Sequence, residues 1–262
     1  MCAIATTLAL HPTLAQLPFE IVQRGQVEPA VVQAVQQATL HSLASLRRLG
    51  VVLDGPPKAY LCATKADFAD VLVEFGLFDR PTAERRSHLY SGQSALGAFA
   101  LNLEYIRSYT ARPDLQVWWT VPHEMFHLYQ RQSRMDRRRT PFAFWEGPAE
   151  LHKLKVMDER RVINFPAYVK ATQLPRSQQA RKNQPAFSIR QIGIGTPDAR
   201  TLGDFYRIAA ALGIYLHETA GWPKIIALYA PGDTVFPTQF EAVFGRPVEE
   251  FEKDFFAWLD RQ

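Results

Sequence analysis

The feature that most constrains this chain is the run His123-Glu124-Met125-Phe126-His127, in which two histidines stand four positions apart. Residues four apart lie on the same face of an α-helix, so a helical run lets both imidazoles approach a single cation. Glu124 then lies about 100° further round the helix, beside the open coordination position. The fold must therefore provide a helix here, together with a second segment that supplies another ligand.

A second motif, WEGPAE, spans residues 145–150. Eighteen residues separate His127 from Glu146. A catalytic zinc needs a third protein ligand and a free position for water, and Glu146 is the best candidate for that ligand. We therefore expect one Zn²⁺ per chain, held by His123, His127 and Glu146.

The two motifs resemble those of the gluzincin metallopeptidases, which include thermolysin and the aminopeptidase N group. The spacing of HExxH, eighteen residues and Glu is similar to that of the aminopeptidase N group. The resemblance implies zinc-dependent hydrolysis of peptide bonds, with Glu124 as the general base toward a zinc-activated water. It also implies that Glu150, four residues after the ligand glutamate, holds a zinc histidine from behind, as carboxylates often do.

The resemblance assigns Tyr206 as well. Tyr206 matches a tyrosine of the aminopeptidase N group that hydrogen-bonds the developing oxyanion, because Tyr215-Leu216 falls where the second Tyr-Leu pair of that group would be. A phenol suits this role, since its directed hydrogen bond strengthens as negative charge accumulates. The alternative for Tyr206 is core packing with a satisfied hydroxyl group.

Residues 97–102, GAFALN, lie upstream of the histidines, where zincins carry an edge strand that pairs with an extended substrate. Gly97, Ala98 and Phe99 are therefore expected to bind substrate. Ala100 stands where the aminopeptidase N group has a glutamate that grips the free amine of the substrate, which favours internal cleavage or an unusual substrate. The alternative is an ordinary strand of the sheet.

Two other functions stay open besides a metallopeptidase acting on peptides or proteins. One is a zinc-binding but catalytically silent interaction module, and the other is a zinc hydrolase with a non-peptide substrate. Glu124 argues against the silent module, because a non-catalytic site has no need of a base.

Composition narrows the remaining classes. The 262 residues are 47% hydrophobic, enough for a large core. Two cysteines provide neither a disulfide scaffold nor a cysteine-ligated metal site. The net charge of +4 comes without a zinc-finger spacing or a glycine-rich phosphate loop, so nucleic-acid binding is not expected. No apolar run reaches the roughly 20 residues that span a bilayer.

The predicted fold class is α+β and zincin-like, with residues 18–262 as a single catalytic domain. A small mixed sheet is expected in an N-terminal lobe of residues 18–132, and a mainly helical lobe in 133–262. Residues 1–17 are either a signal remnant, which would favour secretion or the periplasm, or an ordinary N-terminal segment of a cytoplasmic protein.

Apolar periodicity and turn residues predict strands at 19–22, 58–62 and 99–106, and helices at 28–49, 66–75 and 121–132. Pro122 lacks a helix N–H, so the helix that carries the histidines either begins near Thr120, with Pro122 in its first turn, or is a longer, kinked helix from about Asp114. Residues 170–190 show no clear periodicity and are expected to form a surface loop or a lid.

Overall fold

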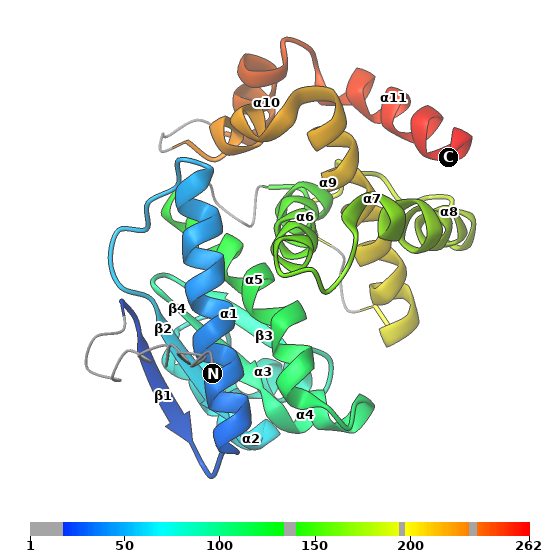
Figure 1. Ribbon diagram of the computed structural model, residues 1–262. Coiled ribbons are helices and arrows are strands. Elements are labelled where there is room, and N and C mark those ends of the chain that lie inside the picture. Colours follow the sequence, from blue (N-terminus) through cyan, green and yellow to red (C-terminus); the bar gives the residue numbers. More distant parts are fainter. Residues whose placement is uncertain (1–17, 134–139, 194–196, 231–234) are drawn as a thin grey trace, which may run out of the picture.

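The computed structural model describes residues 18–133, 140–193, 197–230 and 235–262, so the segment 1–17 lies outside the described residues. The fold is α+β, as predicted, with one small mixed sheet and many helices (Figure 1). The strands are β1 (Glu20–Arg24), β2 (Lys58–Cys62), β3 (Gly92–Ala95) and β4 (Ala98–Asn102). The helices are α1 (Pro29–Arg48), α2 (Lys65–Glu74), α3 (Arg80–Ser87), α4 (Leu103–Tyr109), α5 (Pro113–Gln132), α6 (Phe142–Glu159), α7 (Phe165–Tyr168), the π-helix η2 (Val169–Gln173), α8 (Leu174–Asn183), α9 (Ala199–Leu228), α10 (Phe236–Phe244) and α11 (Val248–Arg261).

The strand order of the sheet is β1-β2-β4-β3. Strands β1, β2 and β4 are parallel, and β3 runs antiparallel to β4. Strand β4 is therefore paired on both sides, and β3 is the edge strand next to it, with β1 at the opposite edge. The expectation that residues 97–102 form a free edge strand is wrong, because β3 occupies the hydrogen-bonding side of β4 that a substrate would need.

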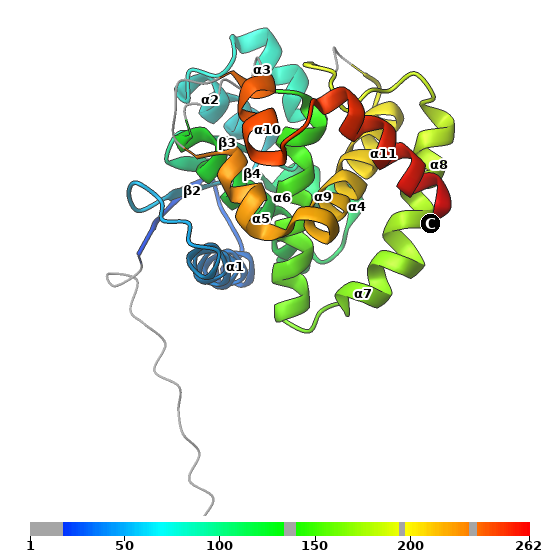
Figure 2. The same ribbon diagram turned by 90° about the horizontal axis from the view of Figure 1, so that it is seen from above.

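Helices cover both faces of the sheet. Side chains alternate between the faces of a strand, so Leu61 and Phe99 enter the main core with α1 and α5, whereas Cys62 and Ala100 join a smaller cluster with α2. Figure 2 shows the sheet between α1 on one side and α2 and α3 on the other. Helix α5 is central: it packs against α1, against β3 and, on its other side, against α6.

Helix α5 begins at Pro113 and carries Pro122 in its interior. The longer of the two predicted helices is therefore the correct one. Thr120 does not cap the helix, because its hydroxyl donates to the Gln116 carbonyl one turn earlier at 3.4 Å. The turn from His123 to His127 is fully helical, as the motif requires.

The predicted strand at 99–106 is correct only in its first half. Strand β4 ends at Asn102, and α4 starts at the next residue. The Asn102 side chain accepts a hydrogen bond from the Tyr105 N–H at 3.1 Å and so caps α4. Asn102 is thus both the last residue of β4 and the N-cap of α4. The apolar residues that follow it belong to the helix and not to the strand.

The helices after α5 form the remainder of the molecule, with α6 packed along α9. The prediction of a loop or lid at 170–190 is wrong for most of its length, since η2 and α8 occupy residues 169–183. The buried face of α8 consists of Leu174, Ser177 and Ala180. Two of these three side chains are small or polar, so the helix has little apolar periodicity in sequence.

Within the described part of the chain, no helix combines the length and the hydropathy needed to cross a bilayer.

Candidate metal centre

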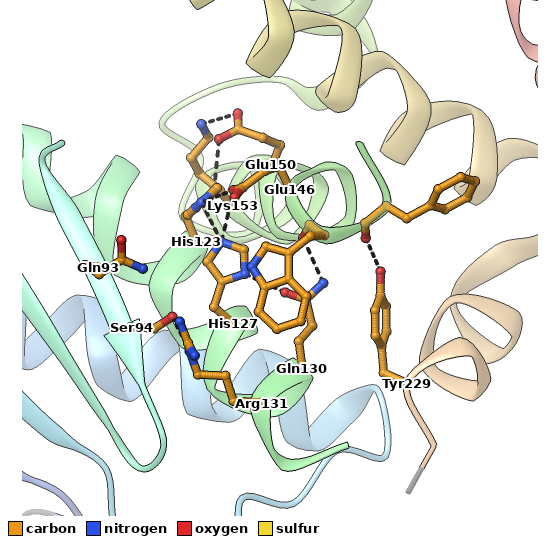
Figure 3. Close-up of polar contacts among 12 residues, drawn as sticks. Gln93, Ser94, His123, His127, Gln130, Arg131, Glu146, Glu150, Lys153 and Tyr229 are labelled. Atoms are coloured by element: carbon orange, nitrogen blue, oxygen red, sulfur yellow. Dashed lines mark hydrogen bonds and ion pairs between the residues drawn. The ribbon is translucent and has the colours of Figure 1, made fainter. Parts of the chain in front are cut away.

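Three buried side chains converge on one point between α5 and α6. The Nε2 atoms of His123 and His127 are 2.9 Å apart, and each lies 3.1 Å from Oε2 of Glu146. His123 and His127 extend from successive turns of α5, and Glu146 reaches them from α6 (Figure 3). The structure therefore brings together the three residues that the sequence assigns as metal ligands.

The geometry of this triad fits a small cation with nitrogen and oxygen ligands. Zinc bonds of about 2.0–2.1 Å at tetrahedral angles separate the donor atoms by about 3.3 Å. The observed separations of 2.9 to 3.1 Å are within about 0.4 Å of that value. Two imidazoles and one carboxylate are a donor set that proteins use for catalytic zinc.

Close packing of α6 on α9 sets the position of Glu146. A Cβ atom on Gly147 would lie 2.5 Å from the Ala209 carbonyl oxygen, and one on Gly213 would lie 2.2 Å from the Gly147 carbonyl oxygen. Only glycine fits at such distances, so the two backbones touch at this crossing. The residue before Gly147 is the candidate ligand Glu146, and the crossing therefore fixes the depth at which its carboxylate enters the site.

Glu150 holds His123 from the side opposite the metal position. Its Oε1 lies 2.9 Å from Nδ1 of His123, and its Oε2 pairs with the Lys153 ammonium group. Burial alone would raise the pKa of Glu150, but Lys153 and His123 outweigh it and hold the pKa at about 2. The structure thus places an ionised Glu150 against the imidazole of His123, a candidate ligand.

The second histidine of the triad, His127, has a different partner from that of His123. Its Nδ1 contacts Oε1 of Gln130, and the Gln130 amide donates to the Trp145 carbonyl at 2.8 Å. The Trp145 ring stacks on the His127 ring at 5.4 Å, with an interplanar angle of 11°. Sequence reasoning missed Gln130, although a polar residue three positions after a ligand histidine lies on the same helix face and could have signalled the contact.

The electrostatics of the triad favour a positive charge at its centre. Burial lowers the pKa of the His123 imidazole, but Glu146 and Glu150 outweigh that effect and raise the pKa to about 10. Burial would likewise raise the pKa of Glu146, yet the two histidines lower it well below its usual value. Two ionised carboxylates thus favour a positive charge at this buried point. Either protons on the histidines or a bound divalent cation provides that charge.

Glu124 faces a cleft beside the triad. The cleft has a volume of about 260 Å³, and its lining includes Thr120, His123, Glu124 and Tyr206. A Cβ atom on Gly92 would lie 2.8 Å from Oε1 of Glu124. Strand β3 therefore approaches the Glu124 side chain so closely that a larger residue at position 92 would displace the carboxylate, which the sequence did not reveal.

Aromatic side chains form much of the cleft wall. Tyr206 comes from α9, with its ring centroid 6.1 Å from that of His123 and 5.4 Å from that of Phe142. Tyr105 and Trp119 line the same cleft from α4 and α5. The structure thus brings Tyr206 to the site, where its partly buried ring packs against Phe142.

Gly97, Ala98 and Phe99 do not line this cleft. Gly97 lies in the turn between β3 and β4, while Ala98 and Phe99 are buried in β4. The part of the sheet that lines the cleft is Gly92 of β3. The short hairpin between β3 and β4 escaped sequence analysis, and with it the identity of the edge strand.

Comparisons of the chain with models of protein families, with curated proteins and with solved structures find no match.

Proposed function

We propose that this chain is a zinc-dependent metallopeptidase with a zincin-like catalytic domain, in which His123, His127 and Glu146 hold one Zn²⁺. The observation that carries the proposal is the convergence of the three donor atoms at 2.9 to 3.1 Å, beside a cleft that also contains Glu124. Zinc is favoured over harder cations because two of the three donors are imidazole nitrogens.

Zinc bound at such a site polarises a substrate carbonyl and makes water acidic enough to react near neutral pH. Glu124 is suited to take a proton from the attacking water and to pass it to the leaving amine, because its carboxylate lies in the cleft next to His123. Tyr206 lines the same cleft and is suited to donate a hydrogen bond to the oxygen of the tetrahedral intermediate.

The surroundings support a peptide as the substrate. The cleft is smaller than the roughly 300–1,000 Å³ of drug-sized ligand pockets, which suits one or two residues of an extended chain. Strand β3 contributes Gly92 to the cleft, and the sheet pairs β3 on one side only, with β4. Ala100 is buried on the far face of the sheet, so it offers no group to grip a free amine, and internal cleavage is favoured.

The proposal is tested by incubating the zinc-loaded protein with a panel of unrelated peptides and one unfolded protein, and analysing the products for new termini by mass spectrometry. The variant Glu124→Gln should bind zinc as the unmodified chain does but cleave at least about 100-fold more slowly, since the ligands remain and the base does not. Glu84→Gln, at an exposed position of α3, is the matched control and should cleave normally.

Two results would contradict the proposal. Undiminished cleavage by Glu124→Gln would remove the role assigned to Glu124. A protein that binds zinc but produces no new termini from any member of the panel would favour the silent module or a non-peptide substrate.

A further inference from the structure

We infer that Gln130 is a positioning residue that fixes the tautomer of His127, so that Nε2 of this histidine is the nitrogen available to the metal. The inference rests on the metal-binding part of the proposed function and is independent of the substrate. It concerns the hydrogen-bonded chain from Trp145 through Gln130 to His127, which joins the two helices that carry the ligands (Figure 3).

The orientation of the Gln130 amide follows from its neighbours. Gln130 is fully buried, with no water-accessible surface. Its amide group faces the Trp145 carbonyl oxygen at 2.8 Å on one side and Nδ1 of His127 on the other. A carbonyl oxygen can only accept a hydrogen bond, so the NH₂ group of Gln130 must face Trp145. The amide oxygen is then left for His127.

The protonation of His127 follows in turn. The amide oxygen of Gln130 can only accept, so Nδ1 of His127 must carry the hydrogen. In a neutral imidazole the lone pair is then on Nε2, which is the atom that lies 2.9 Å from His123 and 3.1 Å from Glu146. The stacked Trp145 ring holds the plane of the imidazole at the same time. A backbone carbonyl on α6 thereby selects the metal-binding nitrogen on α5.

The same contacts explain why the partner of His127 is an amide, that of Gln130, whereas the partner of His123 is the carboxylate of Glu150. The Glu150 carboxylate has a cation, Lys153, at its second oxygen. The corresponding position at Gln130 is occupied by the Trp145 carbonyl oxygen. A carboxylate at residue 130 would face that oxygen in a buried site, and the repulsion would disturb the residue that orients His127. Gln130→Glu should therefore impair the site, although an extra negative charge near zinc would by itself strengthen binding.

The experiment measures zinc affinity by competition with a chromogenic chelator for the unmodified chain, Gln130→Glu and Gln130→Met. Both variants should bind zinc about 10–100-fold more weakly, as is typical when the partner of a ligand histidine is lost. Gln132→Met, two residues along the same helix and partly exposed, is the control and should bind normally. Thermal unfolding in excess chelator shows whether each variant is folded.

A second measurement needs no variant. Long-range ¹H–¹⁵N NMR of the histidines in the zinc-loaded, unmodified protein should show His127 with a hydrogen on Nδ1 and the metal on Nε2. Metal on Nδ1, or tighter zinc binding by Gln130→Glu, would overturn the inference. If Gln130→Met is folded and binds zinc normally, the inference is overturned while the proposed function stands. If the unmodified chain binds no zinc, both are overturned.

Discussion

His152 should make the protein lose stability in acid, by an amount that follows from its burial. His152 lies on α6 and is fully buried, and its Nδ1 lies 2.8 Å from the Pro122 carbonyl oxygen. Burial, together with the charge of His123, lowers the pKa of His152 to about 4. The imidazole is therefore neutral in the folded protein, with Nδ1–H donating to Pro122 in the turn that precedes the first ligand.

The loss of stability in acid follows from the difference in the pKa of His152 between the unfolded and the folded protein. In the unfolded chain, His152 has an ordinary pKa of about 6.5 and takes up a proton as the pH falls through that value. In the folded protein, it does so only near pH 4. Between these values the unfolded state binds more protons, so the contribution of His152 to stability is complete above about pH 6.5 and is lost as the pH falls toward 4. The difference between the two titrations amounts to about 2.5 kcal/mol between pH 7.5 and pH 4.5.

The assay is urea unfolding at pH 7.5 and at pH 4.5, in excess chelator, for the unmodified chain and for His152→Leu. Chelator removes the pH dependence of metal binding, and the other titrating groups are shared by the two proteins. The unmodified chain should lose about 2.5 kcal/mol more of its unfolding free energy than the variant does. If the two proteins lose stability in parallel, within about 0.5 kcal/mol, His152 is not held neutral by burial and the reasoning is refuted.

Three further predictions concern the cleft wall, the helix crossing and the buried thiol of Cys62. Trp119 lines the cleft, whereas the ring of the adjacent Trp118 stacks on Arg160. Trp119→Ala should therefore raise the KM for a cleaved peptide about tenfold, and the control Trp118→Ala should leave it unchanged. Equal effects of the two variants on KM would contradict this placement. Gly147→Ala would bring a Cβ atom to 2.5 Å from a backbone carbonyl oxygen of α9, whereas a Cβ atom on Gly203 would meet nothing within 4 Å. Calorimetry should show Gly147→Ala destabilised by about 3 kcal/mol or more, and the control Gly203→Ala at least as stable as the unmodified chain. Equal melting temperatures of the two variants would contradict the tight crossing. Burial raises the pKa of the Cys62 thiol to about 12, so a thiol reagent at pH 8 should modify Cys62 only after denaturation. Rapid labelling of the peptide that contains Cys62 in the native protein, located by mass spectrometry, would show that this thiol is accessible.

The two candidate histidine ligands could be predicted from the sequence because their spacing is a property of one element. His123 and His127 are four residues apart, and a helix alone is sufficient to align them. The prediction of Glu146 also required the motif spacing of a known family. The residues between the two motifs do not indicate that α6 packs against α5. The structure brings the three side chains together as the motif spacing predicts.

The partners of the ligands and the cleft wall were harder to predict, because they depend on tertiary contacts. Gly92 reaches Glu124 only through the placement of β3 against α5, and the contact of Gln130 with Trp145 depends on the crossing of α5 and α6. The edge strand was misassigned for a related reason. Strand β3 is only four residues long and consists of small and polar residues, so it has no apolar alternation that could separate it from its surroundings.

Helix boundaries failed where local signals were weak or conflicting. Pro122 favours a helix start, but the burial of Val117 and Val121 against the core retains the preceding turns in α5. In α8 the small buried side chains leave no apolar stripe, so burial against α9 rather than periodicity maintains the helix.

The most direct test of the central claim is the zinc content of the purified full chain, measured by elemental analysis after reconstitution with zinc and removal of unbound metal. The unmodified chain and the control His41→Ala, a histidine on α1 outside the triad, should each retain one zinc per chain. His127→Ala and Glu146→Ala should lose the metal or bind it much more weakly, because each removes one of the three converging donors. An unmodified chain that retains no zinc, or variants that retain it fully, would contradict the assignment of this triad as the metal site.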